Sequence, residues 1–178
     1  YDTYRIPSGM TREEVLDRER PVFAAHVRVA RAVDKPLVIH VRDAYAEMIE
    51  ALRIEQSIKS NLVRGVIHCY TGTWENAEQF LDLGFYMGFT GVVTFPPKKS
   101  DPGAHEALLE VVRRVPLERL LLETDAPYLA PGQYRGKRAE PWMVHETARK
   151  IAELKGVSYE EIARITTRNA QNLFVIHT

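Results

Sequence analysis

The sequence predicts an α/β fold with a parallel sheet, because short apolar runs alternate with helical patterns along the chain. Four runs are expected to be strands, at residues 37–40, 65–68, 85–89 and 120–125. Three of these runs end on side chains that commonly bind metals, namely His40, His68 and Asp125. Because the carboxyl ends of barrel strands form one catalytic face, we expect these side chains to converge there.

The helices are expected from apolar residues at helical spacing and from capping signals. Residues 11–14 are a possible capping box, and a helix is expected from about Pro21 to Val33, with Pro21 in its first turn. The other helices are expected at residues 43–54, 73–83, within 101–115, 142–154 and 158–173. A long proline-containing loop, residues 126–141, separates the last strand from the last two helices.

Four strands are too few to close a (β/α)8 barrel, which needs about eight. An open half would expose two sheet edges and an apolar face. The residues alone leave three explanations: a further half upstream, association of two copies, or an open doubly wound sheet. Tyr1 is not an initiator residue, so we expect sequence upstream of it. No linker or repeat divides residues 1–178, which we expect to form a single domain.

The composition of the chain argues against a broadly basic nucleic-acid-binding protein, a disulfide-bonded protein and a membrane-spanning protein. The chain is 45% apolar and 27% charged, and its 24 basic residues balance its 24 acidic ones. A nucleic-acid contact must therefore come from a local basic patch. The single cysteine, Cys69, excludes an internal disulfide and fits a reducing, cytoplasmic setting. No apolar stretch reaches the ~20 residues of a membrane span, and no obligate protein partner is evident.

Each candidate ligand also has an ordinary structural explanation. A single histidine at a strand end is more often a hydrogen-bonded packing residue than a ligand, which applies to His40 and His68 alike. Asp125 can be an N-cap, because the following Ala126-Pro127 can open a turn or a helix. The occurrence of all three residues at three strand ends favours metal binding. Imidazole and carboxylate are the ligands that a hydrolytic divalent metal needs.

Longer motifs carry a resemblance to a known family. They are the segments 35–44 (KPLVIHVRDA), 65–71 (GVIHCYT), 123–131 (ETDAPYLAP) and 135–141 (RGKRAEP). In this order they resemble the signature of the TatD family of metal-dependent deoxyribonucleases. The resemblance covers nearly the whole chain, from Tyr1 to Phe174.

The resemblance implies a (β/α)8 TIM barrel of the metal-dependent hydrolase type, with roughly the N-terminal half missing from this chain. It implies that His40, His68 and Asp125 bind divalent metal ions, two in number, with Mg, Mn and Zn as candidates. Two family features, a His-x-His pair and a bridging glutamate, are absent from these residues. Asp125 would also accept a proton from the attacking water.

The implied reaction is hydrolysis of phosphodiester bonds in DNA. Substrate contacts are expected from Arg42, Tyr128, Arg135, Lys137 and Arg138. A guanidinium fork suits phosphate, although a solvated charge run is the usual explanation for such a cluster. Glu123 is expected to orient a ligand imidazole, with a simple ion pair as the alternative. Tyr70 and Trp74 are further candidates for stacking on a base, but packing is their commoner role.

Two alternative functions stay open from the sequence. An amidohydrolase acting on a small amide or ester would need the same metals but not the basic residues 135–138. A fragment that lacks part of its metal site would be inert. The balanced charge favours a substrate that enters by its end or as a single strand over a duplex.

Overall fold

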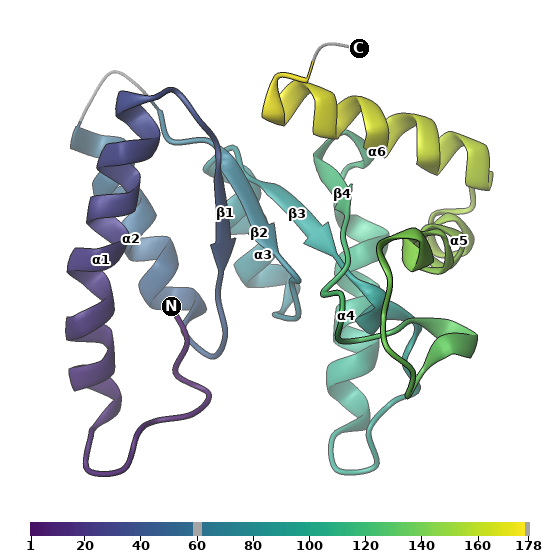
Figure 1. Cartoon of the computed structure of the whole chain (residues 1–178), viewed down its shortest axis with the longest axis horizontal. Coiled ribbons are helices and arrows are strands. Elements are labelled where there is room, and N and C mark those ends of the chain that lie inside the picture. Colours follow the sequence, from purple (N-terminus) through teal and green to yellow (C-terminus); the bar gives the residue numbers. More distant parts are fainter. Residues whose placement is uncertain (59–61, 177–178) are drawn as a thin grey trace.

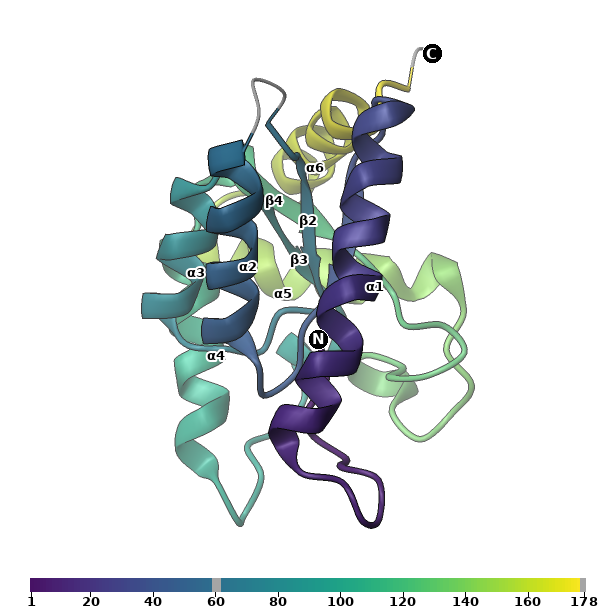
Figure 2. The same cartoon turned by 90° about the vertical axis from the view of Figure 1, so that its left-hand side faces the viewer.

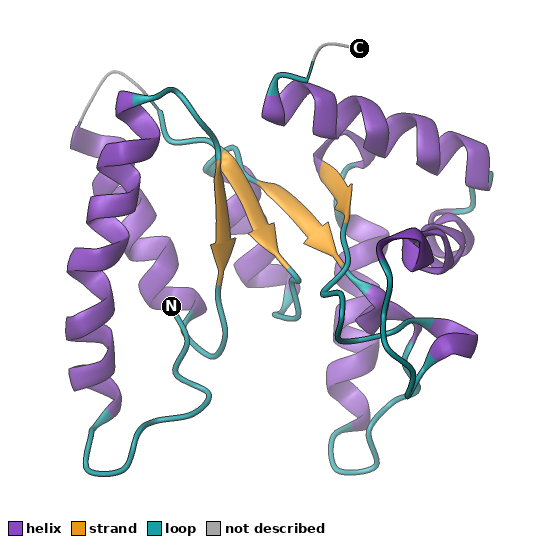
Figure 3. Ribbon diagram, in the orientation of Figure 1, coloured by secondary structure: helices purple, strands orange, loops and turns teal. Residues whose placement is uncertain are grey.

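The computed structural model describes residues 1–58 and 62–176, and it contains four parallel strands that neighbour one another in chain order (Figure 1). They are β1 (Leu37–His40), β2 (Gly65–His68), β3 (Tyr86–Phe89) and β4 (Leu120–Leu122). All four carboxyl ends reach the same edge of the sheet (Figure 3). The predicted α/β architecture with a parallel sheet is therefore confirmed.

Helices and short 3-10 segments connect the strands. The α-helices are α1 (Arg12–Ala32), α2 (Tyr45–Ile58), α3 (Trp74–Asp82), α4 (Pro102–Arg114), α5 (Val144–Lys155) and α6 (Tyr159–Phe174). The 3-10 segments are η1 (Gly91–Thr94), η2 (Leu117–Arg119), η3 (Gly132–Tyr134) and η4 (Pro141–Met143). Across the described ranges, no helix is both long and apolar enough to span a membrane.

The helices that join consecutive strands, α2, α3 and α4, pack on one face of the sheet (Figure 2). Ile39, Ile67 and Met87 lie on this face and are buried in the main core with side chains from these helices. A doubly wound sheet reverses its strand order, whereas a (β/α) barrel keeps its strands in chain order. The observed order therefore excludes the doubly wound alternative for the described residues.

The opposite face of the sheet is apolar near α6. Val66 of β2 and Leu121 of β4 pack against Leu173 of α6. In Figure 1, α6 crosses near the amino-terminal ends of the strands, away from their carboxyl edge. Val38 of β1 lies on the same face but is 60% exposed. Helix α6 therefore does not cover the carboxyl edge of this face, where the polar residues at the strand ends lie.

The first three residues continue the sheet beyond the end of β1. Asp2 forms a parallel bridge with Arg42. The amino group of Tyr1 donates to the carbonyl of His40 at 2.8 Å, and the backbone N–H of Arg42 donates to the carbonyl of Tyr1 at 2.8 Å. This pairing places Asp2 beside His40, which the sequence does not indicate.

The first helix begins earlier than predicted. It starts directly after Thr11, whose side chain forms a complete capping box with Glu14. The predicted start near Pro21 is wrong, because Pro21 lies inside the helix. Proline in a helix removes one backbone donor and crowds a preceding carbonyl. The cap and the buried Leu16 and Val27 on either side hold the helix across that position.

The remaining elements differ from prediction mainly at their ends. Helix α2 continues to Ile58 instead of ending near Ile54, and α5 begins at Val144 because the preceding residues form η4. Ser158 caps α6 as predicted, since its hydroxyl accepts from Glu161 N at 3.1 Å. Strand β4 ends three residues before the expected Asp125, which therefore lies in the following loop.

A buried amide attaches α6 to the sheet. The Nδ2 of Asn169 donates to the carbonyl oxygens of Leu117 and Leu120, at 2.7 and 2.9 Å. Asn169 is 2% exposed, so water cannot replace these bonds. The contact holds α6 at the beginning of β4, the strand that leads to Asp125.

We predict that Asn169→Ala lowers the free energy of unfolding by about 2 kcal/mol, because two buried carbonyl groups lose their donor. Urea denaturation followed by circular dichroism measures the change. Thr167→Ala is the matched control on the same helix, and its exposed site predicts a change within about 0.5 kcal/mol. Equal stability of the two variants would contradict the anchoring role of Asn169.

Candidate metal centre

His40 and His68 are neighbours at the carboxyl edge of the sheet. Strands β1 and β2 pair in parallel so that the two histidines are register partners. Because side chains alternate along a strand, both lie on the face opposite the buried Ile39 and Ile67. The His40 side chain is 56% exposed and that of His68 is 25% exposed. The sheet thus brings both strand-end histidines to one edge.

His68 lies between two carboxylates. Its Nδ1 is 2.8 Å from Glu123 Oε2, and its Nε2 is 2.8 Å from Asp125 Oδ1. Hydrogen bonding to Glu123, together with the negative charges of Glu123 and Asp125, raises the pKa of the imidazole above its usual value, although burial opposes this. The surroundings of His68 therefore favour positive charge at this point.

Glu123 reaches His68 across a gap that only glycine provides. The register places Gly88 of β3 between β2 and the end of β4. A Cβ atom at Gly88 would lie 2.2 Å from Glu123 Oε2, so a larger residue would displace the carboxylate. The same oxygen accepts the backbone N–H of Cys69 at 3.0 Å. A glycine inside an apolar strand is a sequence signal of such a close approach.

The Oδ1 atom of Asp125 is buried but accepts no hydrogen bond within the described residues. Its 2.8 Å contact with His68 Nε2 is an ion pair when the imidazole is protonated. In the neutral imidazole only one nitrogen carries a proton. With that proton on Nδ1, which faces Glu123, Nε2 presents a lone pair to a carboxylate oxygen. Two such acceptors repel unless a proton or a metal cation lies between them.

The donor set fits a divalent metal ion. An imidazole nitrogen and a carboxylate oxygen that face each other are the mixed ligands that Zn and Mn accept, and carboxylate also suits Mg. Glu123 at the other ring nitrogen of His68 is the kind of partner that orients a ligating histidine. Of the alternative explanation for Asp125, the turn is present, since Tyr128 N donates to the carbonyl of Asp125 at 2.7 Å, but no helix begins at that residue.

His40 has a different partner. Its Nε2 is 3.1 Å from Asp2 Oδ2, and the sequence prediction did not include Asp2 in the site. Among the described residues, no three His, Cys, Asp or Glu side chains form a ready metal cluster. In this structure His40 contacts Asp2, whereas its register partner His68 contacts Glu123 and Asp125. The roles of His40, His68 and Asp125 as metal ligands stay predictions.

Cys69 follows His68 directly, and its thiol lacks the low pKa that an activated nucleophile needs. Burial raises the pKa of the Cys69 thiol to about 12. Its Sγ lies 3.2 Å from the hydroxyl oxygen of Thr90. Since only the thiolate is a strong nucleophile, a thiol with this pKa stays inactive at neutral pH. The predicted role of Cys69 as a small packing residue agrees with this environment.

The predicted substrate-binding residues are exposed but lie in two places. The guanidinium of Arg42 lies over the ring of Tyr4, 3.4 Å from its centroid, beside the Asp2–His40 pair. The guanidinium of Arg135 lies 3.9 Å from the ring centroid of Phe95. The others, Tyr128, Lys137 and Arg138, belong to the loop after Asp125. Of the aromatic candidates, Tyr128 is 73% exposed and Tyr70 is 2% exposed, so Tyr70 packs in the core.

The loop after β4, residues 126–143, is held close to Asp125. Ala139 N donates to the carbonyl of Pro127 at 3.0 Å. Gly132 N donates to the hydroxyl of Thr94 at 2.8 Å. A small apolar cluster closes the loop from within; it contains Ala126, Ala130, Tyr134, Ala139 and Met143. These contacts place the basic segment 135–138 in a folded loop whose base adjoins the candidate centre.

The sequence is similar to a known family and to several known proteins. The family model described as TatD related DNase matches residues 6–175. An uncharacterized metal-dependent hydrolase, YcfH, from Escherichia coli K12 is 44% identical over 163 residues, which are 92% of this chain and 58% of YcfH. A Rahnella protein named 3'-5' ssDNA/RNA exonuclease TatD is 34% identical over 164 residues, covering 90% of this chain and 59% of that protein.

A solved structure shares the fold. YJJV, a TatD homologue from Escherichia coli K12, superposes with a TM-score of 0.78 and 24% sequence identity, covering 95% of this chain and 61% of YJJV. This likeness and the parallel sheet fit a TIM-barrel-like fold. The chain spans 58% of the length of YcfH. The family match over residues 6–175 does not support the expectation that the N-terminal half of the barrel is missing.

We predict that Glu123→Gln lowers the pKa of His68, because the amide keeps the shape of the side chain but loses its charge. The measurement is a pH titration of the His68 ring protons by NMR in metal-free protein. The pKa of folded His68 is raised above the usual 6.5. The contact of charged His68 with Glu123 therefore contributes fully to the free energy of unfolding below about pH 6.5. This contribution is lost as the pH rises through the pKa that His68 has in the folded protein.

The free energy of unfolding should follow the same pattern. The difference between the wild type and Glu123→Gln should be largest on the acidic side of this range and shrink toward alkaline pH. The exposed Glu78→Gln on α3 is the control and should change neither quantity. An unchanged pKa of His68 in Glu123→Gln would contradict the assigned contact.

Proposed function

We propose, from the premise that this chain belongs to the TatD related DNase family, that it hydrolyses phosphodiester bonds in DNA with the help of divalent metal ions. The observation that carries the proposal is the contact between His68 Nε2 and the buried, unsatisfied Oδ1 of Asp125. The contact lies at the carboxyl edge of a parallel sheet, where (β/α) enzymes place their reacting groups.

The residues of the centre have distinct roles in this proposal. His68 and Asp125 would hold one ion, and His40 would contribute to binding a second, with Mg, Mn and Zn as candidates. When bound, the ions would supply charge neutralisation at the phosphoryl oxygens and an activated water at neutral pH. Glu123 fixes the His68 ring so that Nε2 faces the ligand. The carboxylate of Asp125 would accept the proton of the attacking water.

The basic segment 135–138 would bind the phosphates of the substrate. Arg135, Lys137 and Arg138 are exposed, and neither Lys137 nor Arg138 forms a side-chain hydrogen bond or ion pair within the described residues. A guanidinium stacked on an aromatic ring, as Arg135 is on Phe95, keeps its in-plane N–H donors for a phosphate. These positive charges form a local patch on a chain whose net charge is zero.

The substrate is proposed to be a strand end or a single strand. A local patch neutralises few phosphates, whereas duplex readers usually carry a wider basic face. The Rahnella relative, which is named as an exonuclease of single-stranded DNA and RNA, supports the same class. Arg42 and Tyr128 are proposed as further contacts with the strand. A single cysteine, Cys69, is consistent with a protein that acts in a reducing compartment such as the cytoplasm.

We predict that Asp125→Asn reduces hydrolysis of a 5'-labelled single-stranded oligonucleotide at least about 100-fold, because the amide cannot accept the proton. The assay is run with Mg, Mn and Zn in turn, and metal content is measured on the same samples. The exposed Asp82→Asn at the end of α3 is the control and should keep wild-type activity.

Three results would contradict the proposed function. The first is a metal-loaded wild type that leaves single-stranded and duplex DNA intact. The second is turnover of small amides or esters that Arg135→Ala leaves unchanged, which would indicate an amidohydrolase. The third is a chain that binds no metal and has no activity, which would indicate an inert fragment.

A further inference from the structure

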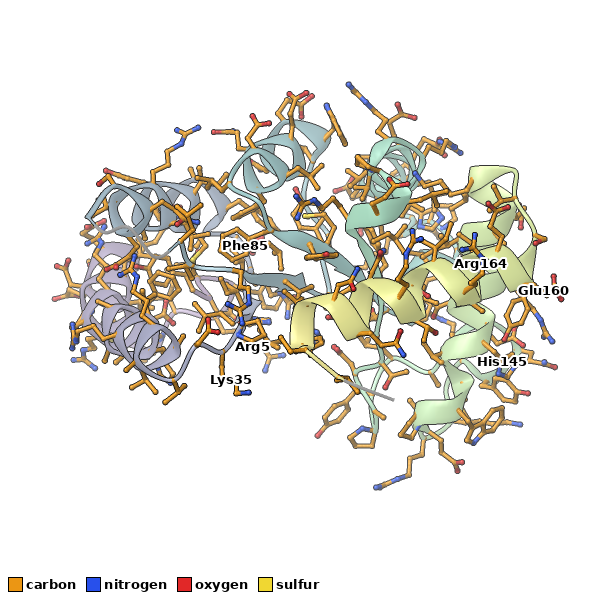
Figure 4. The ribbon with its side chains drawn as sticks, turned by 90° about the horizontal axis from the view of Figure 1, so that it is seen from above. Arg5, Lys35, Phe85, His145, Glu160 and Arg164 are labelled. Carbon is orange, nitrogen blue, oxygen red and sulfur yellow. The ribbon has the colours of Figure 1, made fainter. Side chains whose placement is uncertain are left out.

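Trp142 and His145 form a parallel aromatic stack at the surface. Their ring centroids are 5.4 Å apart and the planes differ by 16°. Tyr134 meets both rings edge-on, with centroids 5.2 Å from Trp142 and 6.4 Å from His145. Figure 4 shows His145 at the opposite end of the molecule from α1. No sequence signal for metal binding or phosphate binding involves these three rings.

The stack is held in place by hydrogen bonds. The His145 Nδ1 lies 2.9 Å from the carbonyl oxygen of Trp142, and its Nε2 lies 3.0 Å from Glu146 Oε1. The indole N–H of Trp142 donates to Glu140. Both rings are therefore fixed before any ligand arrives, which reduces the entropy lost on binding.

Trp142 is the more exposed of the two tryptophans of the chain. It is 50% exposed although one of its faces lies against His145. Trp74, by contrast, packs against the main core and is covered by the guanidinium of Arg114, 4.1 Å from the ring centroid. A fixed, half-exposed indole is suited to contact a flat apolar ligand surface.

The stack is joined to the candidate centre through the loop of residues 126–143. Met143, next to Trp142, packs in the same small cluster as Ala126, next to Asp125. The exposed basic segment 135–138 lies in the same loop. The charge of Glu146 is balanced by Arg149, whereas Glu140 keeps its negative charge, because its partner is the neutral indole N–H of Trp142. An incoming polyanion therefore meets the three positive charges of segment 135–138 against the one negative charge of Glu140, beside an exposed aromatic face.

We propose that Trp142, backed by His145, is a stacking platform for one unpaired base of a single-stranded nucleic acid whose phosphates contact residues 135–138. This inference rests on the proposed function and names a contact for its substrate. The pairing of an aromatic face with local positive charge is the chemistry that binds single strands without sequence preference. A duplex cannot offer the same contact, because its bases are stacked inside the helix.

The test uses the two tryptophans as separate reporters. In Trp74→Phe the fluorescence comes from Trp142, and in Trp142→Phe it comes from Trp74. Each protein is titrated with a short oligothymidine in the presence of EDTA, so that binding is measured without hydrolysis. We expect quenching in Trp74→Phe and none in Trp142→Phe. Quenching of both proteins or of neither would overturn the proposal.

Affinity gives a second readout, measured with a labelled oligothymidine by anisotropy. Trp142→Ala should weaken binding about tenfold, in the range that loss of one stacked base produces. Trp142→Phe should stay within about threefold of wild type because a ring is retained. An abasic strand of equal length should bind wild type and Trp142→Ala equally. The platform is refuted if Trp142→Ala binds oligothymidine with wild-type affinity. It is also refuted if Trp142→Ala loses as much affinity for the abasic strand as for oligothymidine.

These results separate the inference from the proposed function. Oligothymidine that quenches Trp142 but is never hydrolysed with any metal would support the platform and reject the nuclease. Suppose that wild type and Trp142→Ala hydrolyse oligothymidine equally well and that oligothymidine does not quench the fluorescence of Trp142. This result would support the nuclease function and reject the stacking platform. A surface that docks a protein instead would leave Trp142 unquenched by oligothymidine, which also rejects the platform.

Discussion

The contact of His68 with Glu123 and Asp125 is the interaction on which the candidate centre depends. It joins the end of β2 to two carboxylates that follow β4, although those strands are separated by β3. The contact needs three strands in register and a glycine at Gly88, over which the Glu123 carboxylate lies. A change in any of these three strands would separate the imidazole from its partners.

The buried charges explain why this edge is suited to a cation. A carboxylate oxygen without a hydrogen bond in a buried place is unfavourable unless positive charge lies near it. At low pH that charge is a proton on His68, whose pKa is raised by its neighbours. A divalent ion can take the same position when the proton leaves. The electrostatics of these residues are therefore suited to binding a cation.

Local signals in the sequence predicted most of the framework. Apolar runs located the four strands, and the Ser158 cap located the start of α6, because these signals act between residues close in the chain. The capping box at Thr11 was recognised, but it was not used to place the start of α1. The start of α1 was mispredicted, because Pro21 is a common first-turn residue and here lies in a helix interior. The position of Asp125 beyond β4, rather than in it, also escaped prediction, because strand ends depend on pairing with neighbours.

Contacts between distant residues escaped prediction for a different reason. Asp2 pairs with His40 across 38 residues, and no repeating pattern in the sequence indicates this pairing. The stack of Trp142 on His145 is local instead, because the two residues are three apart where η4 runs into α5, and this spacing was not recognised as a signal. By contrast, side-chain alternation predicted that Glu123 points the same way as Asp125, and both carboxylates contact His68, although β4 ends at Leu122.

The assignment of a metal to His68 and Asp125 can be measured by titrating the metal-free protein with Zn²⁺ and following the His68 ring by NMR. We predict that the His68 signals move as zinc binds and that Asp125→Asn weakens this binding at least about tenfold. Zinc that binds with the His68 signals unchanged, or binds Asp125→Asn equally well, would contradict the assignment of a metal to this pair.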